Sequence, residues 1–104
     1  MYEVYKLPII DKRINESFTK IEIIQLKKFI DKLKINPYIG KPIKYDFLRE
    51  AKFREKRVYF LIYNEICLVL VIGESDKKSQ QQTINNIIKN LKLYKKLAYE
   101  LYRD

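Results

Sequence analysis

The spacing of hydrophobic residues along the chain changes between strand-like and helical, and these changes predict the order of its elements. Residues 2–7 alternate as in a short strand, which Pro8 ends. Residues 9–16 predict a short helix, and a capping-box sequence that starts at Thr19 predicts a longer one ending at residues 36–37. We expect these two helices to pack as a helical hairpin.

The second half of the chain predicts three strands followed by a long helix. The strand-like runs are residues 45–54, 57–63 and 66–73, and the last two are rich in β-branched and aromatic residues. Ser75 or Asp76 should cap the helix, whose apolar residues repeat about every 3.6 positions almost to the C-terminus. The expected fold class is α+β in the order β-α-α-β-β-β-α, with a small antiparallel sheet.

Residues 64–65 are expected to form a two-residue hairpin turn. Tyr63 then pairs with Ile66. By the same register Arg57 faces Ile72, so the start of the last helix should lie beside Arg57.

Residues 55–56 are expected to form the preceding two-residue turn. Arg54 then pairs with Arg57. Lys52 pairs with Tyr59, on the same side of the sheet. Opposed arginines repel each other, so stability alone would not favour this arrangement.

The two faces of the predicted sheet differ in character. One face is apolar and should lie under the helical hairpin; its members are Phe53, Val58, Phe60, Ile62, Cys67, Val69 and Val71. Basic side chains gather at one end of the sheet, namely Lys52, Arg54, Lys56, Arg57, Lys77 and Lys78. Lys77 and Lys78 are expected in the first helical turn, where the macrodipole disfavours cations, so an anionic partner such as a phosphate backbone is expected.

Composition supports attraction to nucleic acid or to an anionic membrane, and charge alone does not choose between the two. The 104 residues should form a single domain, residues 1–104, in which 22 Lys and Arg outnumber 13 Asp and Glu for a net charge of +9. The lysines of the first two helices we interpret as surface solvation; they include Lys27, Lys28, Lys32 and Lys34. One cysteine predicts no disulfide framework and a cytosolic location, and the sequence shows neither a membrane span nor a leader peptide.

Several kinds of chemistry are excluded by residue types. The chain has no histidine and one cysteine, which excludes a zinc site or a histidine-based triad. Two isolated glycines exclude a P-loop and a dinucleotide fingerprint, and no cofactor is expected. RNA cleavage remains compatible with these residue types, because the 2′-hydroxyl of the substrate is the nucleophile. Lys, Arg, Tyr or a carboxylate can take its proton, neutralise the phosphate and help the leaving oxygen depart.

Three segments follow one another in this order of elements: NPYIGKPIKYDFLRE, KRVYFLIYNEICLVLVIG and DKKSQQQTI. They resemble the RelE/ParE toxin superfamily, especially its small RelE-like and addiction-module killer proteins. In the RelE branch the resemblance implies metal-independent cleavage of messenger RNA in the ribosomal 30S A site, countered by a cognate antitoxin. In the ParE branch it implies inhibition of DNA gyrase, and a member that only binds its antitoxin is a further alternative.

The resemblance also implies roles for individual residues. Arg57 resembles the arginine that opens the third strand of RelE-type toxins and contacts the scissile phosphate. Lys52 and Arg54 match the basic pair on the preceding strand. Lys77 or Lys78 matches the basic residue after the last strand, an acid or phosphate ligand.

On the C-terminal side, where many RelE toxins have a tyrosine or histidine, this chain has Gln80 to Thr83. Lys52 or Tyr59 is therefore expected to act as the general base. The candidate catalytic residues are thus Arg57, Lys52, Lys77 and Tyr59. The candidate RNA-binding residues are Arg49, Arg54, Lys56, Lys78 and Gln80. An antitoxin segment is expected to cover apolar residues near the end of the last helix, namely Tyr94, Leu97, Leu101 and Tyr102.

Overall fold

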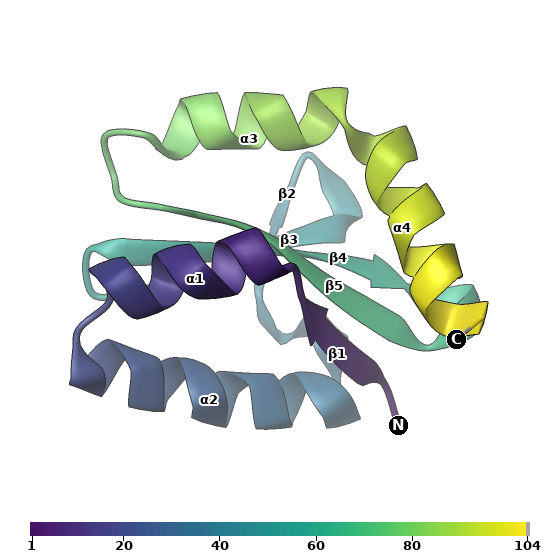
Figure 1. Ribbon diagram of the computed structural model, residues 1–104, viewed down its shortest axis with the longest axis horizontal. Helices are drawn as coiled ribbons and strands as arrows, with labels where there is room; N and C mark the ends of the chain where they lie inside the picture. The colour runs from purple at the N-terminus through teal and green to yellow at the C-terminus, as the bar shows by residue number, and fades with distance from the viewer. Residues whose placement is uncertain (104) are drawn as a thin grey trace.

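The computed structural model describes residues 1–103 as a five-stranded sheet with helices against both faces (Figure 1). The strands are β1 (Glu3–Lys6), β2 (Lys41–Ile43), β3 (Tyr45–Phe53), β4 (Lys56–Tyr63) and β5 (Leu68–Ser75), in the spatial order β1-β5-β4-β3-β2. The helices are α1 (Pro8–Ser17), α2 (Lys20–Ile35), α3 (Gln80–Lys89) and α4 (Leu91–Arg103), and two 3-10 turns are η1 (Pro37–Ile39) and η2 (Asn64–Ile66). No helix within residues 1–103 is long and apolar enough to cross a membrane.

The expected α+β fold with an N-terminal helical hairpin is confirmed, and the capping box at Thr19 is present as predicted. The sheet, however, is mixed rather than antiparallel. Strand β1 runs parallel to β5, with Val4 opposite Val69. Parallel strands need a connection longer than a tight hairpin, and here it includes α1, α2 and three strands. Strand β2, which the sequence did not predict, adds a short antiparallel edge beside β3.

The predicted single C-terminal helix is two helices. The break is at Asn90, whose amide donates to the carbonyl of Ile87 (3.0 Å) and whose side chain donates to the carbonyl of Asn86 (2.8 Å). Figure 1 shows α3 lying along the sheet and α4 turning down across its end. The apolar period continues through the break, because both helices bury residues against the same face.

The sheet separates two hydrophobic cores. Helices α1 and α2 pack on one face, and the predicted apolar face is confirmed for Phe53, Val58, Phe60, Ile62, Val69 and Val71. Cys67 was wrongly assigned to it, since this residue is exposed in the β4–β5 turn with φ 49°. Helices α3 and α4 cover the other face, which holds Leu48, Tyr59, Leu61 and Leu70.

The β4–β5 register differs from the two-residue turn that we expected. The turn spans residues 64–67, so Tyr63 pairs with Leu68 rather than with Ile66. A bulge between Tyr59 and Phe60 then shifts the ladder again. Together the longer turn and the bulge place Arg57 opposite Ser75 instead of Ile72.

The β3–β4 register is also shifted. The turn consists of Arg54 and Glu55, because Arg54 adopts the left-handed conformation (φ 56°) that a tight hairpin requires. Lys52 therefore lies opposite Arg57, and the predicted repulsion between paired arginines does not occur. Lys52 and Arg57 still emerge on the same side of the ladder.

Gly40 is needed where the chain enters β2. A Cβ atom there would lie 2.8 Å from Phe60 Cζ and 2.9 Å from the Glu50 carbonyl oxygen. We expect Gly40→Ala to lower the free energy of unfolding by about 1–3 kcal/mol, as overpacking does elsewhere, measurable by thermal denaturation. Gly73→Ala is the control, because its nearest contact is the movable Ile87 side chain at 3.2 Å; an equal loss in both variants would contradict this explanation.

Candidate functional site

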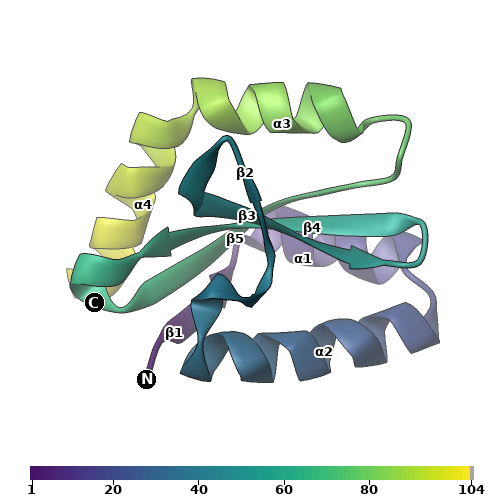
Figure 2. The ribbon, with the colours of Figure 1, turned by 180° about the vertical axis from the view of Figure 1, so that it is seen from behind.

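Most of the predicted site residues meet at the end of the sheet where the β3–β4 turn and the β5–α3 loop lie together (Figure 2). We call this region the sheet-end site. Its members are Glu50, Lys52, Arg54, Lys56, Arg57, Tyr59, Ser75, Lys77, Lys78 and Gln80. No group of three or more Cys, Asp or Glu side chains within residues 1–103 could hold a metal ion.

Arg57 is the most unusual residue of the sheet-end site. It is only 7% exposed, and its Nη1 donates a long hydrogen bond (3.4 Å) to the carbonyl of Glu55. Its Nε is buried without a hydrogen-bond partner among the described residues. A buried N–H group without a hydrogen-bond acceptor is costly, so the Arg57 guanidinium is suited to an anion from outside.

Tyr59 is too deeply buried to act as a general base. Its side chain is fully buried, and its hydroxyl lies 2.9 Å from Ser75 Oγ. Burial raises the pKa of Tyr59 to about 12, although the hydrogen bond between Tyr59 and Ser75 acts in the opposite direction. Neither its location nor its pKa fits the role of base that we expected for it.

Glu50 is the residue that sequence reasoning missed. It lies opposite Tyr59, is 7% exposed, and accepts a 2.8 Å hydrogen bond at Oε2 from Nε2 of Gln80, the first residue of α3. Gln80 therefore positions a buried carboxylate beside Arg57's strand. Alternation along β3 was the available signal, because Glu50 shares the face of Lys52.

Lys77 and Lys78 do not lie in the first turn of a helix. Helix α3 begins at Gln80 with Ser79 as its N-cap, while the predicted cap Ser75 is the buried last residue of β5. The two lysines occupy the preceding turn and line an open hollow of about 590 Å³ together with Glu55, Lys56 and Asp76. The argument from the macrodipole therefore fails for them, although both are exposed beside the site.

Asp76 organises this turn. Its Oδ1 accepts hydrogen bonds from the Ser79 amide (2.9 Å) and the Ser79 hydroxyl (3.0 Å). These bonds lower the pKa of Asp76, and Lys56 contributes in the same direction. The carboxylate thus fixes the loop that carries Lys77 and Lys78.

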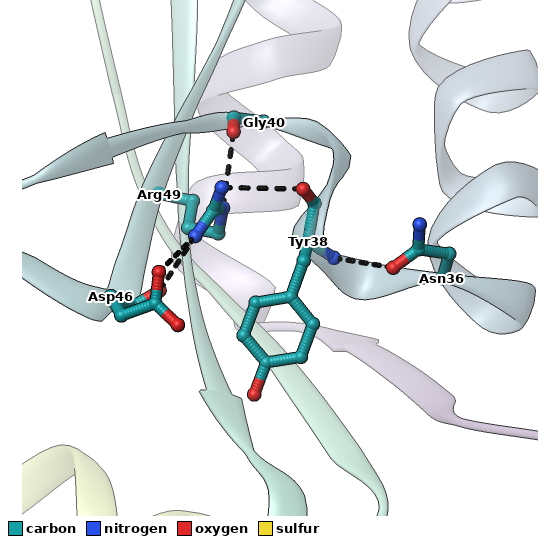
Figure 3. Close-up of polar contacts among 5 residues, drawn as sticks. All are labelled: Asn36, Tyr38, Gly40, Asp46 and Arg49. Carbon is teal, nitrogen blue, oxygen red and sulfur yellow. Dashed lines mark hydrogen bonds and ion pairs between the residues drawn. The ribbon is translucent and has the colours of Figure 1, made fainter.

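Arg49 lies outside the sheet-end site, although we had expected it to bind RNA. Figure 3 shows its guanidinium between β3 and the η1 segment. It donates to the carbonyls of Gly40 (3.1 Å), Asp46 (2.9 Å) and Tyr38 (3.2 Å), and to Asp46 Oδ1 (2.8 Å). Since it also lies over the Tyr38 ring, 5.4 Å from its centroid, Arg49 holds the η1–β2 segment against β3.

Comparison with known proteins gives matches in structure alone. No family model matches the chain, and no curated protein matches it. Among solved structures, the toxin in the intact E. coli RelBE toxin–antitoxin complex superposes with a TM-score of 0.63 at 20% identity, covering 73% of this chain and 96% of that one.

Two further structures are similar. The isolated E. coli RelE toxin has a TM-score of 0.63 at 18% identity and covers 84% of this chain and 99% of its own. A double arginine-to-alanine mutant of E. coli RelE in the free state has a TM-score of 0.66 at 18% identity, with coverages of 83% and 97%. The chain therefore has the fold of the RelE toxins.

Proposed function

We propose that this protein is the toxin of a type II toxin–antitoxin module and that it cleaves messenger RNA in the ribosomal A site without a metal ion. The observation that carries the proposal is the buried Arg57 guanidinium, unpartnered at Nε, among Lys52, Lys56 and Lys77. The RelE fold supports it, since the similar structures are of a toxin and one is bound to its antitoxin.

In this mechanism Arg57 binds the scissile phosphate and neutralises the charge that accumulates as the 2′-oxygen attacks phosphorus. A base removes the 2′-hydroxyl proton, and an acid protonates the 5′-oxygen that leaves, which yields a 2′,3′-cyclic phosphate. Lys52, which is exposed and directly opposite Arg57, serves as the acid in this mechanism. Lys77 and Lys78 bind flanking phosphates from the loop before α3.

Glu50 is our candidate for the general base. It is a carboxylate on the same face as Arg57, held by Gln80, and the sheet-end site contains no histidine. Because its neighbour Tyr59 stays protonated with a pKa of about 12, the phenol can donate a hydrogen bond but does not compete for the proton. In this proposal Glu50 takes the role of base that we first expected of Lys52 or Tyr59.

Replacing Glu50 with Gln should reduce the cleavage rate by about 10²–10⁴-fold while RNA binding remains, because only proton transfer is lost. The measurement is single-turnover cleavage of ribosome-bound message together with RNA affinity. Glu55→Gln, the same change on the exposed turn, is the matched control. Equal cleavage by both variants would assign the base to another group.

A protein target is the second candidate. An apolar hollow of about 380 Å³ near the start of α4, lined in part by Tyr38, Phe47, Tyr63 and Leu91, favours a protein ligand. Such a ligand is the cognate antitoxin or, in the ParE manner, a target such as DNA gyrase. On α4, where we expected an antitoxin segment to bind, Tyr94, Leu97 and Leu101 are partly buried and Tyr102 is 59% exposed.

Expression in a bacterial host separates these functions. The proposal predicts growth arrest with an immediate fall in amino-acid incorporation, and rescue by the product of an adjacent antitoxin gene. Normal translation with a change in plasmid supercoiling would instead favour gyrase. Neither effect, with antitoxin binding retained, would identify a protein that only binds its antitoxin.

A further inference from the structure

A second basic surface lies between α2 and the end of the β3–β4 hairpin. Lys28 and Lys32 of α2 and Lys52 and Arg54 at the end of β3 line a hollow of about 380 Å³. Its remaining lining residues are Gln25, Phe29 and Phe53. We call this hollow the α2 groove.

The cations of the α2 groove are not neutralised by the protein. The ion pairs within residues 1–103 involve Lys6, Lys34 and Arg49, and none includes a cation of the groove. The groove has no acidic lining residue, in contrast to the hollow beside α3, which contains Glu55 and Asp76. Four like charges around one concave surface raise its positive potential.

The arrangement is also unfavourable for α2 by itself. Lys28 and Lys32 are four residues apart and so lie about 6 Å from each other on one helix face, where like charges destabilise the helix. A face that served only to stay hydrated would gain from a carboxylate at one of these positions. An anion bound beside these two lysines would offset this repulsion.

The groove is connected to the sheet-end site through Lys52. This residue lines the groove and pairs across the ladder with Arg57, the proposed phosphate ligand. Below the cations, Phe29 and Phe53 meet edge to face with their centroids 5.7 Å apart. The groove thus contains two aromatic side chains and four cations, one of which lies opposite Arg57.

We propose that the α2 groove binds the phosphodiester backbone of RNA on one side of the cleaved phosphate. This inference rests on the proposed ribonuclease function and adds a binding surface to it. Lys28 and Lys32 contact backbone phosphates, and Lys52 contacts the RNA where it runs from the groove to Arg57.

Titration of an uncleavable RNA tests this proposal. The probe is a short fluorescent single-stranded RNA with 2′-O-methyl riboses, and affinity is measured over a series of salt concentrations. Lys28→Gln with Lys32→Gln should weaken binding and reduce the slope of log K against log salt by about 1.4, because each lost contact to single-stranded RNA contributes about 0.7. Lys20→Gln with Lys27→Gln is the control, since both lysines are exposed on α2 outside the groove.

Equal slopes in the two double variants would overturn the proposal, as would RNA binding too weak to detect in the unchanged protein. Reduced binding to polyglutamate with unchanged RNA binding would also overturn it and assign the groove to an acidic protein. Translation arrest by the unchanged protein is recorded in parallel. Arrest that persists despite equal slopes refutes the groove alone, whereas absence of arrest refutes the proposed function independently.

Discussion

Replacing Arg57 with alanine is expected to abolish growth arrest and leave the protein folded. The loss of its charge at the scissile phosphate should lower the cleavage rate by about 10²–10³-fold, the effect of removing one preorganised donor to a developing negative charge. Stability should be unchanged or higher, because the guanidinium is buried with one long hydrogen bond and an unpartnered Nε. The measurements are colony formation on induction and thermal denaturation of purified protein.

Arg13→Ala is the matched control, an exposed arginine on α1. Arg57→Gln, which keeps hydrogen-bonding capacity without charge, distinguishes loss of the phosphate ligand from any packing defect of the alanine variant. Full toxicity in a folded Arg57→Ala variant would remove Arg57 from the proposed site.

Replacing Arg49 with alanine is expected to have the opposite profile. The free energy of unfolding should fall by about 2–3 kcal/mol, because three carbonyl groups lose a charged donor that is itself buried. We give the ion pair with Asp46 little of this effect, since that carboxylate is 80% exposed. For a chain of this size the melting temperature should drop by about 8–20 °C.

Arg49→Lys should recover little of this stability, because one ammonium cannot reach carbonyls on both sides as the guanidinium does. Asp46→Asn, which removes only the exposed charge, should be nearly neutral. A stable Arg49→Ala protein with weakened RNA affinity would contradict the structural role and restore the RNA contact that the sequence suggested.

Side-chain alternation explains why the sequence predicted the faces of the sheet but not its registers. In both the expected and the observed β3–β4 pairings, Lys52, Arg57 and Tyr59 emerge on one side, because the two pairings preserve the alternation of both strands. The pattern therefore assigns these residues to one face without saying which residue opposes which. The geometry of the turn determines the register, and nothing in the sequence marks Arg54 as the residue that adopts a positive φ.

Other features of the fold could not be predicted from the sequence, because they depend on contacts between residues far apart in the chain. The longer β4–β5 turn and the bulge at Tyr59 together place Arg57 opposite Ser75, and the pairing of β1 with β5 joins residues more than sixty positions apart. Arg49 and Arg57 look alike in sequence, each a cation in a strand. Only the fold shows that backbone carbonyls surround the Arg49 guanidinium. It also shows that the Nε of Arg57 has no hydrogen-bond partner among the described residues.

Mapping of cleavage in a reconstituted translation system tests the central claim most directly. Purified protein is added to a defined message with and without ribosomes, and primer extension locates new 5′ ends. The account predicts cuts within codons only when ribosomes are present, and none with Arg57→Ala. An intact message at protein concentrations that stop translation would contradict it.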